Sequence, residues 1–260
     1  MKKFLAVVLS LALVVSVAAC GKKETTSTSE ETSTEVSTEV STEVSEEVVE
    51  ATPIEGEVAV MSYADYAAAA VDDAVVVEFA VQATQSWWDN KITVYGADAD
   101  GAYFVYNMTC SEEDAAKLVP GTVIRVTGFK TEWSGEVEIA EGATFEFVEG
   151  AEAYIAPVFD ATDLLGTDDL VSHINQKVSF KDMTVTAVSY KNDTPGDDIY
   201  VNLSKDDTEY YFCLEYYLNG SDEEFYNLVG NLEVGSVVDV ECFLYWYEGP
   251  NGHLTNVVVK

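Results

Sequence analysis

Short runs of β-branched and aromatic residues, separated by turn-forming residues, dominate the chain from about residue 58 onward. The first run, from Val75 to Thr84, is long and mostly apolar. Lys91 to Gly96 and Ala102 to Met108 follow it on either side of an Asp-Ala-Asp-Gly sequence at 98–101. Because Asp and Gly favour tight turns, these two segments are expected to form a hairpin. The pattern therefore predicts a chain made mainly of short β-strands.

The remainder of the first half predicts a short helix and two further strands. Ser111 is a favourable N-cap residue, and the three acidic residues after it complement the helix dipole, so a helix is expected through Leu118. A Pro-Gly turn then leads into a strand at 122–133, and a Ser-Gly turn reverses the chain into a strand at 136–147. This half therefore has five strands, with a helix between the third and the fourth.

The second half repeats this plan. Each half is also expected to begin with a leading helix, at 63–74 in the first and at 163–174 in the second. The remaining segments of the second half are a long strand at 177–188, a hairpin formed by 199–203 and 209–218, a short helix at 223–229, a strand that starts within 232–240 and a last strand at 254–259.

The N-terminal residues 1–19 have the features of an export signal. Lys2 and Lys3 precede a nearly unbroken apolar run from Phe4 to Val15, which is too short to span a bilayer comfortably. The run ends in Val-Ala-Ala-Cys-Gly at 17–21, which resembles the lipobox of bacterial lipoproteins. The resemblance implies cleavage before Cys20 and diacylation of its thiol, and two acyl chains suffice for stable anchoring. The alternative is an ordinary secretory signal followed by a chance cysteine.

The segment after Cys20 is expected to be a disordered stalk that extends to about residue 57. The tetrapeptide Ser-Thr-Glu-Val recurs at 33–36, 37–40 and 41–44, so valine is the only apolar residue in each unit. Such a sequence buries too little surface to offset the entropy lost on ordering, and its glutamates repel one another. The folded part is therefore predicted to be held away from the extracellular face of the cell membrane, with the membrane contacted through the lipid anchor.

The two halves share the pattern Gly-Thr/Ser-Val-Ile/Val-x-Val, at Gly121 to Val126 and at Gly235 to Val240. This pattern resembles the start of the fourth strand in OB-fold proteins. Over about three-quarters of its length the chain resembles bacterial lipoproteins with tandem OB-like domains. The resemblance implies a mainly β fold of two tandem five-stranded OB-fold-like barrels with short helices, at 58–150 and 151–260. The alternative is a single larger β-sandwich whose hairpins are similar by chance.

The charge of the chain argues against nucleic acid as a partner. The formal net charge is −34, and only nine Lys or Arg residues follow residue 57. Binding to a phosphate backbone needs a basic surface. We therefore expect no nucleic-acid partner.

The sequence predicts no catalytic site, metal or cofactor. The chain has two histidines, and it contains none of the common hydrolase, phosphate-binding or dinucleotide-binding motifs. Cys213, Cys242 and His253 lack the spacing of a zinc site, and His253 beside a turn is expected to be exposed. The acidic turns at 98–101 and 193–198 offer oxygen ligands for Ca²⁺, but Asp and Gly are also the residues that tight turns prefer. We therefore expect a protein that is not an enzyme.

Aromatic residues in the predicted loops are the candidate binding residues, since loops between strands one and two and strands four and five border the ligand face of OB-folds. Aromatic rings there can stack on a ligand. The candidates are Trp87, Trp88 and Trp133 in the first barrel and Tyr190, Tyr245, Trp246 and Tyr247 in the second.

These aromatics predict a glycan or an extended peptide as the extracellular ligand. In this interpretation Asp89, Asn90 and Glu136 accept hydrogen bonds from its hydroxyl groups. The first alternative is an interaction protein of an envelope assembly that uses the same aromatics as a protein interface. The second alternative is that the tryptophans only pack the barrels together. The sequence does not predict the oligomeric state.

Overall fold

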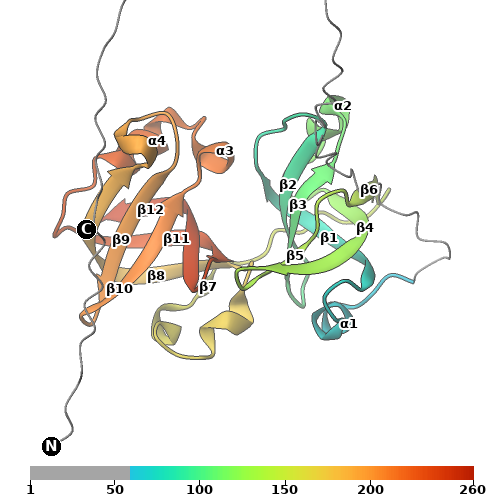
Figure 1. Ribbon diagram of the computed structural model, residues 1–260, viewed down its shortest axis with the longest axis horizontal. Coiled ribbons are helices and arrows are strands. Elements are labelled where there is room, and N and C mark those ends of the chain that lie inside the picture. The colour runs from blue at the N-terminus through green and yellow to red at the C-terminus, as the bar shows by residue number, and fades with distance from the viewer. Residues whose placement is uncertain (1–58) are drawn as a thin grey trace, which may run out of the picture. The chain divides into compact units, whose positions relative to one another are not determined.

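The computed structural model describes residues 59–260 (Figure 1). The expected signal peptide, Cys20 and the expected stalk lie outside the described residues, so the predictions made for them stay predictions. Within residues 59–260, none of the helices has the length and apolar character needed to cross a membrane.

The first barrel consists of five strands closed on themselves, with a sixth strand at its edge. Its elements are α1 (Tyr63–Ala68), β1 (Ala74–Thr84), β2 (Lys91–Ala97), β3 (Ala102–Thr109), α2 (Glu112–Ala115), β4 (Val123–Trp133), β5 (Glu136–Ile139) and β6 (Thr144–Phe147). The strand order is β1-β2-β3-β5-β4-β6, and the additional pairing of β1 with β4 closes the barrel. Alternate residues of these strands, among them Val77, Val105 and Ile124, are fully buried and form its core.

The second barrel repeats this arrangement. Its elements are β7 (Phe159–Asp160), the 3₁₀ helices η1 (Thr162–Leu164) and η2 (Leu170–His173), β8 (Lys177–Tyr190), η3 (Lys191–Asp193), β9 (Ile199–Lys205), β10 (Thr208–Leu214), α3 (Tyr216–Asn219), α4 (Glu223–Gly230), β11 (Val237–Trp246) and β12 (Pro250–Val259). The order is β11-β12-β10-β9-β8-β7, and a pairing of β11 with β8 closes the five main strands. The predicted fold class of two five-stranded barrels is confirmed, and the single sandwich is excluded.

Two predicted strands are shorter than expected. The strand expected at 136–147 is split into β5 and β6, because Gly142 in the intervening turn has a positive φ of 88° that does not fit an extended strand. The strand expected at 209–218 ends at Leu214. Glu215 then caps α3 by accepting a hydrogen bond from the Leu218 backbone N–H, so the following tyrosines are helical.

The two leading helices are also shorter than the sequence predicted. The first, α1, ends at Ala68, and the chain becomes extended at Ala69. The segment expected to form a helix at 163–174 contains only the two 3₁₀ turns η1 and η2. Gly166 lies between them with a φ of 76°, a left-handed conformation that interrupts a right-handed helix.

An aromatic cluster joins the two barrels. Tyr95 and Phe104, which are neighbours across β2 and β3, pack with Phe243 of β11, and the Tyr95 and Phe243 ring centroids lie 4.4 Å apart. Tyr95 Oη is hydrogen-bonded to His253 Nδ1 at 2.6 Å. His253 was expected to be exposed and is instead buried, because β12 begins at Pro250 and carries it into this cluster. Burial lowers the pKa of His253 to about 3, so the imidazole is neutral.

Candidate ligand-binding pocket

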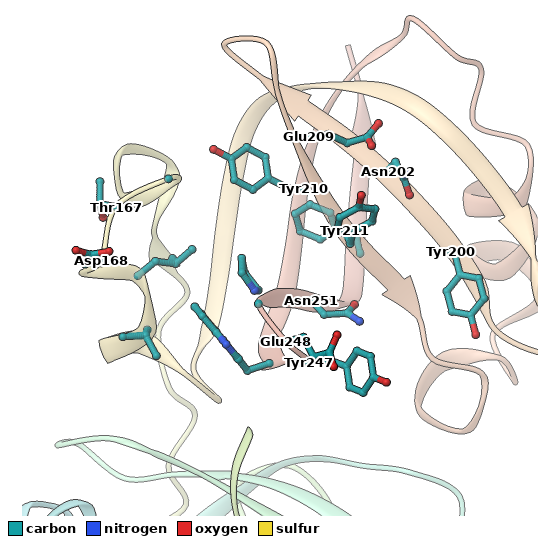
Figure 2. A pocket seen from close by; sticks show the side chains of 17 residues that line it. Thr167, Asp168, Tyr200, Asn202, Glu209, Tyr210, Tyr211, Tyr247, Glu248 and Asn251 are labelled. Atoms are coloured by element: carbon teal, nitrogen blue, oxygen red, sulfur yellow. The ribbon is translucent and has the colours of Figure 1, made fainter. Parts of the chain in front are cut away.

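A pocket of about 870 Å³ lies on the outer face of β9, β10 and β12 in the second barrel. Asn202 of β9 is paired with Tyr211 of β10, and Tyr211 is paired with Asn251 of β12, so the three residues form a row across the sheet. The segment 166–171, which carries Thr167 and Asp168, lies across the pocket from these strands (Figure 2). The volume is typical of small-ligand sites.

Aromatic rings cover the strand side of the pocket. Tyr200 and Tyr211 lie on the outward face of their strands, because alternate residues such as Val201 point into the core. Tyr211 is 57% exposed, and Tyr200 and Tyr247 are also exposed. Trp246 is partly buried at the base of the β11–β12 turn. Solvent-facing rings gathered in a concave site provide surfaces on which a flat ligand can stack.

The polar groups of the pocket are acidic or amide groups. Asp168, Glu209 and Glu248 line it, and no Lys, Arg or His within the described residues does so. The Oδ1 atom of Asn251 is buried without a hydrogen-bond partner. Buried acceptors are normally satisfied, so Asn251 is an amide that lacks a partner within the described residues. The pocket is therefore suited to ligands that present N–H groups and unsuited to phosphate.

The candidate residues in the first loop of the first barrel lie elsewhere. Trp87 is partly buried against the first core, and its indole N–H donates to the Cys110 carbonyl oxygen at 2.8 Å. Trp88 is 68% exposed and does not line the pocket. Asp89 and Asn90 are turn residues with positive φ. The structure therefore does not bring these residues together with the pocket.

The other candidates lie at or near the pocket. Trp246 and Tyr247 line it, and Trp133 of the first barrel, 53% exposed, packs on Tyr247 with ring centroids 5.1 Å apart. Tyr245 instead stacks on His253 between the barrels, and Tyr190 packs on the second core.

Glu136 was expected to accept ligand hydroxyls, and its burial shows that this is wrong. Its side chain is fully buried between the barrels, because the turn at Ser134 and Gly135 brings the start of β5 against the second barrel.

The sequence contained a partial signal for the pocket residues that the loop analysis missed. Tyr200, Asn202 and Tyr211 alternate with buried residues along their strands. Alternation along a strand shows that these residues share one face of the sheet, but it does not show whether that face is open to solvent. Which face is free depends on the pairing of β10 with β12, which joins strands distant in sequence.

The acidic turns are held by internal hydrogen bonds. Asp98 Oδ1 accepts from the backbone N–H groups of Asp100 and Gly101, and Lys191 pairs with Asp197 and Asp198. Among residues 59–260, no group of three or more His, Cys, Asp or Glu side chains is arranged to hold a metal ion. The three cysteines described there, Cys110, Cys213 and Cys242, are buried thiols.

No protein-family model matches the chain, and no curated protein matches it. Several solved structures are similar to the chain at low identity. The Ifi202 HINa domain in complex with double-stranded DNA is 12% identical, with a TM-score of 0.35, and the match covers 72% of this chain and 98% of that one. A murine DNA-binding protein bound to double-stranded DNA is 11% identical, with a TM-score of 0.35 and coverages of 71% and 96%. A replication protein A heterotrimer bound to single-stranded DNA is 12% identical, with a TM-score of 0.31 and coverages of 81% and 52%.

These comparisons correct two expectations. The sequence predicted a glycan or extended-peptide ligand and no nucleic-acid partner, whereas the similar structures named above are complexes with DNA. The exclusion of nucleic acid rested on the net charge of the chain and on the small number of Lys and Arg residues after residue 57. Net charge opposes contact with phosphates, but it does not determine whether aromatic rings and amides on one face can bind a base.

Proposed function

We propose that the folded region is a non-catalytic binding module whose second barrel takes an unpaired nucleobase in the aromatic pocket. The observation that carries the proposal is the row of Asn202, Tyr211 and Asn251, which places an exposed ring between two amide side chains. A base could stack on the ring while its edge is hydrogen-bonded by the amides.

The position of the pocket supports this proposal. In OB-folds the ligand face is formed by strands two and three together with the loops after strands one and four. In the second barrel these strands are β9 and β10, and the β11–β12 turn contributes Tyr247 and Glu248 to the same pocket. The corresponding strands of the first barrel, β2 and β3, carry Tyr95 and Phe104 into the inter-barrel cluster. The face formed by strands two and three is therefore an open pocket in the second barrel, whereas in the first barrel it takes part in the contact between the barrels.

The acidic lining favours the base over the phosphate. Asp168, Glu209 and Glu248 can accept hydrogen bonds from the amino groups of adenine, guanine or cytosine. The same carboxylates repel phosphate, and no cation in the pocket offsets this repulsion. We therefore expect nucleosides to bind better than the corresponding nucleotides.

Tyr211→Ala is expected to weaken the binding of adenosine to the full chain by roughly 10-fold or more, because stacking on an aromatic side chain contributes about 1–3 kcal/mol per base. Isothermal titration calorimetry measures the effect. Trp88→Ala is the matched control, since it removes an exposed ring outside the pocket. An equal loss of affinity in both variants, or no adenosine binding to the parent chain, would refute the proposal.

Two related probes separate a base site from a phosphate site. Adenosine is expected to bind more tightly than adenosine monophosphate. A short single-stranded oligonucleotide is expected to bind more tightly as salt is raised, because screening weakens the repulsion between its phosphates and the acidic face. Binding that weakens with salt, as in counterion release from phosphates, would contradict the proposed site.

We also propose that the chain is a lipoprotein anchored through Cys20 to the extracellular face of a bacterial cell membrane. The lipobox-like sequence at 17–21 supports this proposal. In a bacterial host the full chain is expected to incorporate labelled palmitate and to fractionate with membranes. Cys20→Ala should lose the label and the membrane association, whereas Cys110→Ala, at a buried thiol, should keep both. Label retained in Cys20→Ala would rule out this anchor.

A further inference from the structure

The first barrel holds one wall of the pocket through its β4–β5 hairpin. The Trp246 backbone N–H donates to Glu136 Oε2 at 2.8 Å, and the Glu248 backbone N–H donates to the Ser134 carbonyl oxygen at 2.8 Å. Both donors belong to the chain reversal that joins β11 to β12 and carries the pocket residues Trp246, Tyr247 and Glu248. The position of this wall therefore depends on groups of the other barrel.

Gly135 is the residue that allows the two hairpins to approach. A Cβ atom at this position would lie 2.7 Å from Cδ1 of Trp246, and the φ of 93° is strained for any other residue. Beside it, Trp133 packs on Tyr247. The β4–β5 and β11–β12 hairpins therefore contact each other at close range through backbone groups, the Glu136 carboxyl and the Trp133 and Tyr247 rings.

Glu136 is the carboxyl among the side chains that make these contacts. Its Oε1 atom is buried and has no hydrogen-bond partner, and the Asn175 side chain donates to the Val137 backbone carbonyl oxygen at 3.0 Å. None of the groups that shift its titration is cationic, and Lys130 on β4 donates instead to carbonyls of α1 and the residue that follows it. The titratable groups that interact with Glu136 are Glu138 on β5, Tyr66 on α1, Tyr95 on β2 and Tyr245 on β11.

We propose that Glu136 is a positioning residue for the pocket: in its neutral form it fixes the β11–β12 hairpin against the first barrel, and its ionisation loosens this wall. The first part of the proposal, that Glu136 fixes the β11–β12 hairpin, does not depend on any ligand. Its consequence for ligand binding rests on the proposed function.

The direction of the pH effect on this contact follows from the balance of two effects of ionising Glu136. An ionised carboxylate accepts a stronger hydrogen bond from the Trp246 N–H, but burying a charge without a cation costs more. Burial is the larger effect and raises the pKa of Glu136 to about 8. A carboxyl whose pKa is raised in the closed contact stabilises that contact at low pH. This stabilisation is lost as the pH rises through 8.

The test measures the amide signal of Trp246 in the full chain by ¹H–¹⁵N NMR between pH 6 and 9. In the parent chain this signal is expected to titrate with a midpoint well above the usual range of a glutamic acid. Glu136→Gln keeps an oxygen that accepts the Trp246 N–H and cannot ionise, so its titration should vanish. Glu138→Gln is the matched control because it removes a buried carboxyl of the same strand that makes no bond to Trp246, so it should keep the titration. A signal that does not titrate, or titrates equally in Glu136→Gln, overturns the proposal.

Adenosine binding provides the second readout. The parent chain is expected to bind adenosine several-fold more weakly at pH 9 than at pH 6, whereas Glu136→Gln should bind equally at both. If the Trp246 signal titrates as expected and adenosine does not bind at any pH, the nucleobase site fails while the positioning role stands. If adenosine binds and its affinity has the same pH dependence in both chains, the positioning role fails while the site stands.

Discussion

Lys130→Met is expected to lower the free energy of unfolding of the first barrel by about 3 kcal/mol. The Lys130 side chain is buried, and its ammonium group donates to the backbone carbonyl oxygens of Tyr66, Ala67 and Ala69 at 3.0, 2.9 and 2.8 Å. These carbonyls lie at the end of α1, where Tyr66 also accepts from the Ala69 N–H. Methionine keeps the apolar part of the side chain and removes the ammonium donor from all three carbonyls. The relief of the buried charge offsets part of the loss, which limits the effect to this size.

Chemical denaturation of the full chain, followed by circular dichroism, measures this effect. Lys117→Met is the matched control, because Lys117 is exposed, pairs with Glu113 and Asp114 on the surface and lies 5.9 Å from the centroid of the Phe147 ring. Its expected effect is below about 0.5 kcal/mol. If Lys130→Met were as stable as the parent chain, Lys130 would have no role in closing α1 onto the barrel.

Raising the pH from 6.5 to 9 is expected to destabilise the folded region by on the order of 2 kcal/mol. Burial raises the pKa of Glu136 to about 8 and the pKa values of Glu138 and Glu215 to about 7. In this pH range the folded chain binds protons at these carboxyls that the unfolded chain does not, so stability falls as the pH rises. His253 acts weakly in the opposite direction, because its imidazole is neutral in the folded chain and still partly protonated in the unfolded chain near pH 6.5.

Thermal melting of the full chain at the two pH values checks this expectation. The midpoint is expected to fall by roughly 4–8 °C at the higher pH. In Glu136→Gln the fall should be smaller, because the carboxyl with the largest shift has been removed. A midpoint that is unchanged or higher at pH 9 would show that these carboxyls are hydrated in the folded chain.

The barrels could be predicted because their signals are local. The shared sequence at Gly121 to Val126 and Gly235 to Val240 lies at the start of β4 and β11, and alternating apolar residues marked most strands. The errors in the predicted strand boundaries were also local in origin. A single glycine with positive φ splits the strand expected at 136–147, and a Glu215 cap turns two tyrosines from strand into helix.

The roles of Glu136 and His253 could not be predicted, because their burial depends on how one barrel packs on the other. Glu136 follows a turn and His253 lies near one, which suggested exposure for both. The same limit applies to the pocket. Trp246 and Tyr247 were found because they lie in a loop, whereas Tyr211 and its amide neighbours required the pairing of β10 with β12.

Photochemical cross-linking tests the nucleobase pocket most directly. The full chain would be irradiated with a short single-stranded oligonucleotide that contains 4-thiouridine, and the modified peptides would be located by mass spectrometry. We predict cross-links in the segments 200–211 and 246–251, which carry the rings and amides of the pocket, and their loss in Tyr211→Ala. Cross-links confined to the first barrel around Trp87 and Trp88, or none above background, would contradict a nucleobase site in the second barrel.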